Sequence, residues 1–485
     1  MTLSQIFSGI NIKSTSRSLN DSPIGKITFD SRLALPGDIF VALKGFSSDG
    51  HDFIPSLLSK NLAAIVVEKL PENISLTDET FIVVDDTHET LGKLASNFYR
   101  NPSAKLKLVG VTGTNGKTTI ATLIYQMARM EGKKAGLIST VANYIDDEVV
   151  PATHTTPDPL SINQLLAEMV NKGCEIVAME VSSHAAHQKR IAGLEFDGAV
   201  FTNLTRDHLD YHGTFANYRD AKKIFFDQLP TGSFALINAD DKNANFLVQN
   251  TRSEVFTYSL HSQSDFHCRI LEKNLGFTLV SINSNEIYLQ FTGEYNSYNL
   301  TAVYGAALLL GFQKESVLLN LSKLTPVAGR FQTFRSSDDV TAVIDYAHTP
   351  DALANVLESI REVMNSGRLI TVVGAGGNRD KGKRPMMGKV AVDLSDIIIL
   401  TSDNPRDEDP AVILEEIGLG IPSDNLKPVI VIQDRREAIR AAVAMTRQGD
   451  VILVAGKGHE NYQEIKGVKH HFDDREEIQK AMKIC

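Results

Sequence analysis

The chain reads Gly110-Val-Thr-Gly113-Thr-Asn-Gly116-Lys117-Thr118-Thr119 where a short β-branched segment, 105–111, meets a segment with apolar residues at helical spacing. The expected order is therefore strand, glycine loop and helix. Glycines let backbone N–H groups converge on phosphate oxygens, and the helix start adds its dipole. Lys117 could reach the β/γ-phosphates of a nucleotide, and Thr118 could ligate Mg²⁺. The stretch predicts a nucleotide phosphate site in an α/β fold.

This loop is a variant of the usual phosphate-binding motif. The usual spacing places a glycine five residues before Gly116, but position 111 is Val. A bare Gly-Lys-Thr tripeptide is often an ordinary turn. The strand and helix expected on its two sides favour the phosphate site.

Length and charge limit the class of protein. The 485 residues suffice for about three domains, and 42% apolar with 22% charged residues is typical of globular proteins. The formal net charge of −10 argues against a broad nucleic-acid surface, so an anionic ligand would meet local Lys and Arg clusters.

Cysteine usage and apolar stretches suggest a cellular compartment. Cys174, Cys268 and Cys485 are widely spaced and odd in number, which favours reduced thiols. Segment 1–15 lacks a signal-peptide pattern, and the longest apolar stretch, 300–312, is too short to span a bilayer. We expect a cytoplasmic, monomeric enzyme without a membrane span.

Turn clusters divide the chain into three units. Asn101-Pro102-Ser103 separates a first unit, 1–102, from a central unit, 103–329, and a break around 326–330 precedes a third, 330–485. In the third unit strands alternate with helices, which indicates an open α/β sheet. The expected strands are 340–345, 369–373, 396–400, 428–432 and 451–454, with helices from Pro350 and over 435–446.

Acidic and imidazole groups gather after two apolar segments of the central unit. Glu180 interrupts the end of the expected strand 174–181, and the expected strand 199–202 leads into a loop with Asp207, His208, Asp210 and His212. Ligands of α/β proteins bind at the carboxyl ends of parallel strands, where an acid could hold Mg²⁺ beside a phosphate loop. A solvated carboxylate and a polar loop with a capping aspartate are the ordinary alternatives.

Lys222 lies inside the apolar stripe of an expected helix over 215–226, whereas Lys223 would project toward solvent. Enclosure lowers the pKa of a lysine, so a neutral fraction could react with CO₂ to form a carbamate, an anionic metal ligand. On the helix alone, the simpler interpretation is a lysine whose stem covers apolar surface while its ammonium group reaches water.

Ten ordered motifs together resemble the Mur ligases of peptidoglycan synthesis. They span nearly the whole chain, at 112–118, 180–184, 203–212, 218–222, 293–299, 329–331, 345–350, 377–385, 403–406 and 456–460. The resemblance implies three α/β domains: an N-terminal UDP-binding domain, a central P-loop-type ATPase domain and a C-terminal Rossmann-like domain. Folylpolyglutamate synthetases share only the ATP motifs.

The resemblance implies an ATP-dependent, ADP-forming amide ligase. ATP would phosphorylate the γ-carboxylate of D-glutamate in UDP-N-acetylmuramoyl-L-alanyl-D-glutamate, and an amine would attack the acyl phosphate through a tetrahedral intermediate. Both steps need positive charge, which two Mg²⁺ ions would supply. The implied catalytic residues are Lys117, Glu180, His208 and Lys222. The implied metal ligands are Thr118, Glu180, His208 and carbamylated Lys222. The implied ATP contacts are Gly113, Thr114, Asn115, Gly116, Lys117, Thr118, Thr119, Asn296, Arg330, Asp345 and His348.

The same resemblance implies a site for the UDP-muramoyl dipeptide. Its residues would be Ser31, Gly45, Asp49, Gly50 and His51 in the first unit, and Thr155, Thr156, Ser182, Gln188 and Arg190 in the central unit. The N-terminal segments 28–32 and 45–51 also read as ordinary polar turns. The planar fork of Arg190 suits a carboxylate, although a surface ion pair is its simpler role.

Within the family, Thr155-Thr156-Pro157 and Asp403-Asn404-Pro405-Arg406 resemble the ligase that adds meso-2,6-diaminopimelate as the third amino acid. Its distal carboxylate, absent from lysine, would attract the Arg406 guanidinium. The implied pocket comprises Arg379, Asp403, Asn404, Arg406, Gly456 and Glu460. Out of context, Asp-Asn-Pro-Arg is a strand-ending turn.

Two departures from the family pattern occur: Asn378 stands where Asp is common, and Met386-Met387 replaces a Leu-Met pair. The competing hypotheses are a lysine-adding ligase of the same family and a nonenzymatic nucleotide-responsive scaffold. Arg406 distinguishes a diaminopimelate-adding ligase from the lysine-adding one. The scaffold hypothesis is disfavoured by the presence of Lys117, Glu180, His208 and Lys222.

Overall fold

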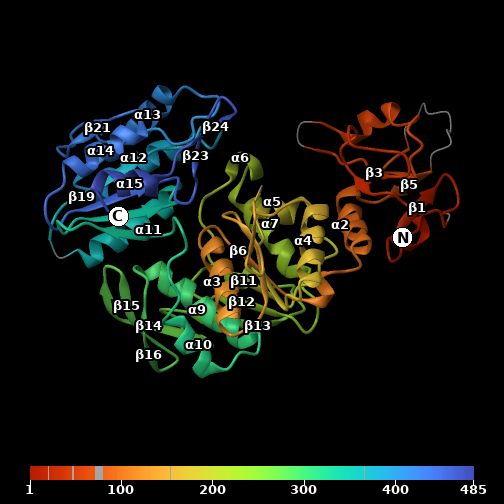
Figure 1. The fold of residues 1–485 in the computed structure, drawn as a ribbon, viewed down its shortest axis with the longest axis horizontal. Coiled ribbons are helices and arrows are strands. Elements are labelled where there is room, and N and C mark those ends of the chain that lie inside the picture. Colours follow the sequence, from red (N-terminus) through yellow and green to blue (C-terminus); the bar gives the residue numbers. More distant parts are fainter. Residues whose placement is uncertain (20, 46–47, 71–79, 153, 365, 485) are drawn as a thin grey trace.

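The computed structural model describes all residues except 20, 46–47, 71–79, 153, 365 and 485, so positions 46–47 of the expected UDP segment and Cys485 lie outside the described residues. Three parts, each built on its own sheet, follow one another along the chain (Figure 1). The expected mixed α/β class and three-part order are confirmed. Within the described ranges, no helix is long and apolar enough to cross a membrane.

The N-terminal part has a five-stranded sheet in the order β1-β5-β4-β3-β2. Its strands are β1 (Ile12–Thr15), β2 (Ile27–Thr28), β3 (Ile39–Val41), β4 (Ala64–Val67) and β5 (Phe81–Val84), of which β1 pairs antiparallel and the others parallel. Its helices are α1 (Leu3–Ile6), η1 (Gly50–Ser56) and α2 (Thr87–Phe98), which leads toward the central part. Both faces of the sheet bury apolar side chains.

The central part has an eleven-stranded sheet in the order β16-β15-β14-β13-β12-β11-β6-β10-β7-β8-β9. The strands are β6 (Lys107–Thr112), β7 (Ala135–Ile138), β8 (Asn143–Ile145), β9 (Glu148–Val150), β10 (Ile176–Glu180), β11 (Gly198–Phe201), β12 (Phe234–Asn238), β13 (Glu254–Ser259), β14 (Phe266–Asn274), β15 (Phe277–Ile282) and β16 (Asn285–Leu289). β6 pairs in parallel with both β10 and β11, so the carboxyl ends of all three lie at one edge.

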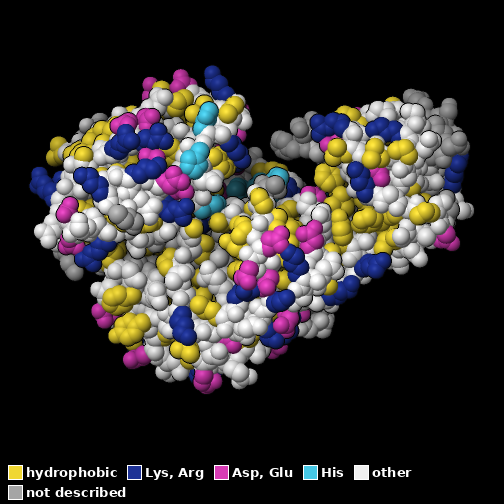
Figure 2. All heavy atoms as spheres, viewed as in Figure 1, with side chains coloured by type: hydrophobic (Ala, Val, Ile, Leu, Met, Phe, Trp, Pro, Cys, Tyr) yellow, Lys and Arg dark blue, Asp and Glu magenta, His cyan; other side chains and the backbone are white. Residues whose placement is uncertain are grey.

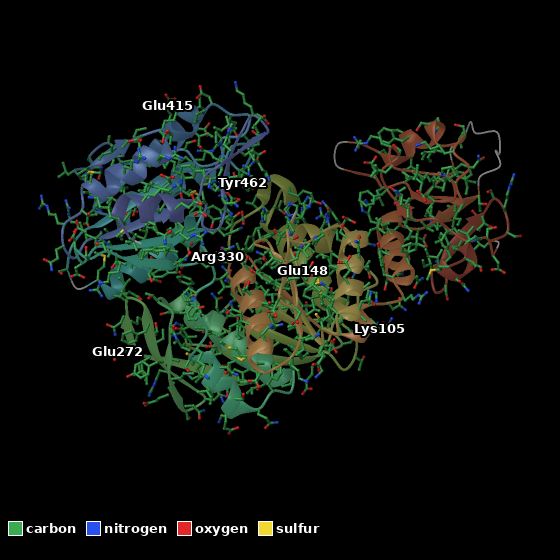
Figure 3. All side chains as sticks on the ribbon, in the orientation of Figure 1. Lys105, Glu148, Glu272, Arg330, Glu415 and Tyr462 are labelled. Carbon is green, nitrogen blue, oxygen red and sulfur yellow. The ribbon has the colours of Figure 1, made fainter. Side chains whose placement is uncertain are left out.

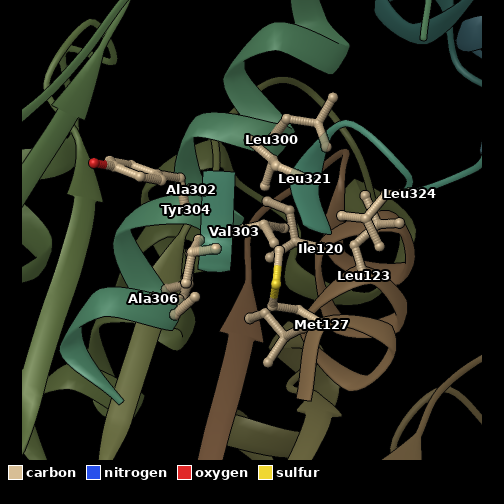
Figure 4. Packing of buried hydrophobic residues seen from close by; sticks show 14 of the residues in the cluster. Ile120, Leu123, Met127, Leu300, Ala302, Val303, Tyr304, Ala306, Leu321 and Leu324 are labelled. Atoms are coloured by element: carbon tan, nitrogen blue, oxygen red, sulfur yellow. The ribbon is translucent and has the colours of Figure 1, made fainter. Parts of the chain in front are cut away.

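Helices cover both faces of this sheet. They are η2 (Ser103–Lys105), α3 (Lys117–Met130), α4 (Pro159–Asn171), α5 (Ser183–His187), α6 (Leu209–His212), α7 (Phe215–Asp227), α8 (Ala244–Leu247), α9 (Glu294–Leu309) and α10 (Lys314–Leu321). On one face Ile120 and Met127 of α3 pack against Leu300 and Val303 of α9 (Figure 4). On the other face, a Cβ at Gly110 would collide with the Phe225 ring, so the missing side chain lets α7 approach β6.

The C-terminal part has a six-stranded sheet in the order β17-β18-β22-β19-β20-β21. The strands are β17 (Gln332–Arg335), β18 (Thr341–Asp345), β19 (Leu369–Val373), β20 (Ile397–Leu400), β21 (Val429–Val431) and β22 (Val451–Ala455), and a separate hairpin joins β23 (Tyr462–Ile465) to β24 (Val468–His471). One face packs against α11 (Pro350–Val363), α12 (Lys383–Leu394) and α13 (Pro410–Gly418), the other against α14 (Arg435–Ala444) and α15 (Asp474–Met482). The expected open α/β sheet is confirmed, with β17 as an antiparallel edge strand that the sequence did not suggest.

Candidate active site

A cavity of about 770 Å³ lies between the carboxyl edge of the central sheet and the C-terminal part. Figure 2 shows histidine side chains in the hollow beside the C-terminal part and along the neighbouring edge of that part. The described lining residues come from the central and C-terminal parts, and include the phosphate loop, Glu180, His208, Lys222 and the expected amino-acid pocket. The cavity therefore brings together most of the site residues expected from the sequence.

The phosphate loop joins β6 to α3 in a conformation that requires glycine. Gly113 has φ +147° and Gly116 has φ +88°, and a Cβ at Gly113 would collide with the Thr202 side chain. Gly116 caps α3 without a side-chain hydrogen bond, so no side chain of the cap competes for the first-turn N–H groups. These groups and the helix dipole are suited to an anionic phosphate.

Two lysines meet at one carbonyl of this loop. Lys117 Nζ donates to the carbonyl oxygens of Gly113, at 2.9 Å, and Thr114, at 2.8 Å. Lys222 Nζ donates to the same Gly113 oxygen at 2.7 Å. Burial lowers the pKa of both amines, and for Lys222 the charge of Lys117 lowers it further.

Lys222 is enclosed within the apolar stripe of α7, so the simpler interpretation that its ammonium group reaches water is wrong. Its side chain is 1% exposed, and its Nζ lies 4.8 Å from the centre of the Tyr218 ring. The expectation for Lys223 is wrong, because its ammonium lies 5.8 Å from the centre of the Phe246 ring of α8 and pairs with Asp227, and the residue is only 9% exposed. Phe246 belongs to a later helix, so the periodicity of α7 could not reveal this cover.

Glu180 presents a carboxylate oxygen to the cavity. It is fully buried at the end of β10; its Oε1 accepts from the Thr140 amide at 2.7 Å, and its Oε2 has no hydrogen-bond partner among the described residues. Such an orphaned oxygen is costly unless a ligand satisfies it. Oxygen donors from Glu180 and the Thr118 hydroxyl are the ligand type that Mg²⁺ prefers.

His208 stands at the start of α6 in the left-handed region, with φ +53°. Its ring lies edge-on to His184 at 4.9 Å, and burial lowers its pKa to about 3, with Asp207 opposing. Its imidazole is therefore neutral at pH 7, the state in which histidine binds metals. No group of three His, Cys, Asp or Glu within the described ranges is already close enough to hold a metal ion.

The segment after the central part carries further expected nucleotide contacts. Arg330 lies where the central and C-terminal parts meet (Figure 3), and its Nη2 donates to Thr118 Oγ1 at 3.0 Å. Asp345 accepts from the amides of Phe331 and Ala347, both at 2.7 Å, while burial raises its pKa to about 6. Burial lowers the pKa of His348 to about 4.

Asn296 donates to the Thr292 carbonyl at 2.8 Å, and Asn299 donates to the Oδ1 of Asn296 at 3.2 Å.

A direct link joins the phosphate loop to the C-terminal part. Asn115 Nδ2 donates to Asp351 Oδ2 on α11 at 2.9 Å, and the Thr205 hydroxyl donates to the same oxygen at 3.1 Å. Sequence reasoning missed Asp351, whose position at the start of a helix suggests only a capping role.

The expected dipeptide residues of the central part form a connected group. Arg190 donates to Gln188 Oε1 through Nε and Nη2, and to the Thr156 carbonyl at 2.8 Å. Thr156 Oγ1 bonds the Ser182 amide, and Thr155 accepts from Thr140. Among the described residues Arg190 is therefore held by neutral oxygens, and the surface ion pair that was the alternative is not formed.

The expected UDP residues of the N-terminal part lie outside this cavity, whose described lining contains none of them. Asp49 accepts from the His51 amide and ring, and a Cβ at Gly50 would lie 2.7 Å from the Leu43 amide nitrogen. The Ser31 carbonyl accepts from Lys60. Gly45 bonds Ser48 through its backbone.

Loops after β19, β20 and β22 form the expected amino-acid pocket. Asn404 Nδ2 donates to Glu460 Oε2 at 2.7 Å, and Gly456, with φ +117°, leaves room for the Asp403 carboxylate. Arg406 Nη1 donates to the Gly377 carbonyl at 2.7 Å, and its Nε lies 3.3 Å from Glu464. Arg379 lines the same cavity. Sequence reasoning missed Lys457, the buried ammonium beneath this pocket.

Comparison with known proteins agrees with this geometry. Three family models match: "Mur ligase family, catalytic domain" over 23–99, "Mur ligase middle domain" over 111–307 and "Mur ligase, glutamate ligase domain" over 329–458. A UDP-N-acetylmuramoyl-L-alanyl-D-glutamate–2,6-diaminopimelate ligase of Phocaeicola vulgatus is 56% identical over 477 residues, covering 98% of each chain. The chain belongs to the Mur ligase family. As a Mur ligase it is an enzyme of peptidoglycan synthesis.

Solved structures of Mur ligases share the three-part architecture. One of a UDP-N-acetylmuramoyl-L-alanyl-D-glutamate–2,6-diaminopimelate ligase matches with a TM-score of 0.69 and 32% identity, covering 100% of this chain and 99% of the other. The MurF ligase of Thermotoga maritima in complex with ADP matches with a TM-score of 0.61 and 21% identity, covering 94% and 96%, and supports the fold alone.

Proposed function

We propose that this Mur ligase uses ATP to join meso-2,6-diaminopimelate to the D-glutamate γ-carboxylate of UDP-N-acetylmuramoyl-L-alanyl-D-glutamate. The observation that carries the proposal is one cavity with a phosphate loop, two lysines that donate to the same loop carbonyl and an orphaned Glu180 oxygen on one side and Arg406 on the other. Relatives that are more than half identical bear the name of this reaction.

The phosphate loop and Lys117 bind the ATP phosphates. The first-turn amides of α3 and the Lys117 ammonium hold negative charge as the γ-phosphoryl group passes to the substrate carboxylate. Thr118, Glu180 and His208 would hold one Mg²⁺ ion and carbamylated Lys222 a second, and the two ions would supply further positive charge at the same place. The orphaned Glu180 Oε2 and the neutral His208 ring support this assignment.

The nucleotide is also contacted by residues outside the phosphate loop, namely Asn296, Arg330, Asp345 and His348. Arg330 Nη2 donates to the Thr118 hydroxyl, which places its guanidinium group beside the proposed phosphate site. The link between Asn115 and Asp351 lets the C-terminal part respond to the occupant of the loop. Nucleotide contacts from two parts of a chain favour closure on binding.

Substrate and amino acid approach from opposite sides. Arg190, with Thr155, Thr156, Ser182 and Gln188, binds the dipeptide carboxylate, while Ser31, Gly45, Asp49, Gly50 and His51 bind the uridine diphosphate. The distal end of diaminopimelate is bound by the C-terminal pocket, which comprises Arg379, Asp403, Asn404, Arg406, Gly456 and Glu460. The domains are 1–102, 103–329 and 330–485, and the enzyme acts as a cytoplasmic monomer.

Omission of single substrates tests the reaction class. ADP formation is expected only when ATP, Mg²⁺, the UDP-muramoyl dipeptide and diaminopimelate are all present, with one amide product formed per ADP. ATP binding without turnover in the complete mixture would contradict the proposal and favour a nucleotide-responsive scaffold.

A further inference from the structure

Lys457 is a fully buried cation beneath the amino-acid pocket. It follows β22 between Gly456 and Gly458, and its side chain is 0% exposed. Its Nζ donates to Asn404 Oδ1 at 3.1 Å and to Glu460 Oε2 at 3.2 Å. The expected pocket residues thus rest on an ammonium group that does not itself reach the cavity, whose described lining excludes it.

Two carboxylates, those of Asp403 and Glu460, lie within 4 Å of the Lys457 ammonium. Asp403 Oδ1 lies 3.7 Å from Lys457 Nζ and has no hydrogen-bond partner in the part of the chain that the structure describes. Burial and the neighbouring Asp403 charge raise the pKa of Glu460, while Lys457 opposes that rise. The ammonium therefore offsets one of two adjacent negative charges in a poorly solvated place.

Lys457 also fixes the orientation of the Asn404 amide. Asn404 Oδ1 accepts from Lys457 and from the Glu464 amide at 2.9 Å, so Nδ2 must face Glu460. Without the ammonium, the amide would lose one of the two donors that distinguish its oxygen from its nitrogen.

We propose that Lys457 is a positioning residue that sets the charge of the amino-acid pocket and thereby its selectivity for a distal zwitterion over a lone distal ammonium. The inference rests on the proposed function. The distal carbon of diaminopimelate carries an ammonium and a carboxylate, whereas the end of lysine carries only the ammonium. Loss of Lys457 makes the pocket one charge more negative, which favours lysine and repels the diaminopimelate carboxylate.

Lys457→Met tests the charge while keeping a long side chain. Lys469→Met is the matched control. The ammonium nitrogens of both lysines lie near the Tyr462 ring, at 5.5 Å from its centre for Lys457 and 4.1 Å for Lys469. Lys469, however, is exposed on β24. We expect the ratio of kcat/KM for diaminopimelate to that for lysine to fall about tenfold or more in K457M, chiefly through KM, with KM for ATP unchanged. K469M should keep the wild-type ratio.

Lys457→Arg keeps the charge and separates it from shape. K457R should keep a higher ratio of kcat/KM for diaminopimelate to kcat/KM for lysine than K457M, even if its turnover falls. This ratio does not depend on the fraction of active enzyme, so partial misfolding does not obscure the comparison. A K457M ratio within twofold of wild type, or equal losses in K457R and K457M, would overturn the inference. Absence of diaminopimelate turnover in the wild type would instead refute the proposed function.

Discussion

Lys117 and Lys222 donate hydrogen bonds to the same acceptor, the Gly113 carbonyl oxygen, at 2.9 and 2.7 Å. The two lysines come from different helices, α3 and α7, and both lose solvation at this point. Two like charges at one carbonyl favour a neutral amine on one of them. Lys222, with less exposure, is the amine that CO₂ would modify.

Lys222→Ala should lower kcat by about 100-fold or more, because it removes the carbamate proposed as a metal ligand. Added short carboxylic acids should restore part of the activity by supplying the missing carboxylate. Turnover measured with and without such acids checks this. Lys223→Ala on the same helix is the control and should retain activity; wild-type turnover in K222A would refute a metal-ligand carbamate.

Thr118→Val should lower kcat/KM for ATP by about 100-fold, since valine keeps the shape but lacks the hydroxyl proposed to ligate Mg²⁺. Thr118→Ser keeps the hydroxyl and should stay within a few-fold of wild type. Titration of Mg²⁺ at fixed ATP measures the effect. Equal activity of the valine and serine variants would remove Thr118 from the metal site.

Arg406→Ala should raise KM for diaminopimelate by about 100-fold, because a charge-assisted contact to its distal carboxylate is lost. KM for lysine should change less or fall, since the repelling guanidinium is gone. Arg436→Ala, at an exposed arginine paired with Glu477, is the control. If KM rises equally for both amino acids, Arg406 does not select between them.

Asp345 should make stability depend on pH. Burial raises the pKa of its carboxyl from 3.8 to about 6, so the folded protein binds the proton more tightly than the unfolded chain. The contribution of Asp345 to the free energy of unfolding is fully present below about pH 4. It decreases as the pH rises through about 6, by up to about 3 kcal/mol.

Comparison of wild type with Asp345→Asn isolates this group. The wild-type free energy of unfolding, measured by denaturant between pH 4 and 7, should fall relative to that of D345N as pH rises. Asp338→Asn, at an exposed aspartate, should run parallel to wild type. A constant difference between wild type and D345N would contradict the assigned pKa.

The sequence was most informative where chemistry is contiguous. The order strand, glycine loop and helix predicted the phosphate loop, and β6 begins only two residues later than expected, because 103–105 form a 3-10 turn. Helical periodicity placed Lys222 inside the apolar stripe of α7, but the simpler interpretation that its ammonium group reaches water is wrong, because the residue is 1% exposed. The apolar run before Glu180 placed that acid at a strand end, as the structure has it.

Contacts between distant segments could not be read in this way. Lys457 looks like a turn residue between two glycines, and its contacts with Asn404 after β20 and with the Tyr462 ring of β23 come from segments outside that turn. The cover of Lys223 by Phe246 depends on α8 in the same manner. The sequence also did not predict that β14, β15 and β16 extend the central sheet as antiparallel strands, because alternating apolar and polar residues do not show which sheet a strand joins.

An amino-acid panel tests the central claim most directly. Purified protein with ATP, Mg²⁺ and UDP-N-acetylmuramoyl-L-alanyl-D-glutamate is given either meso-2,6-diaminopimelate or L-lysine, and phosphate release is followed over a range of concentrations. The account predicts efficient release with diaminopimelate and a kcat/KM for lysine lower by about 100-fold or more. Release with lysine as readily as with diaminopimelate would contradict it.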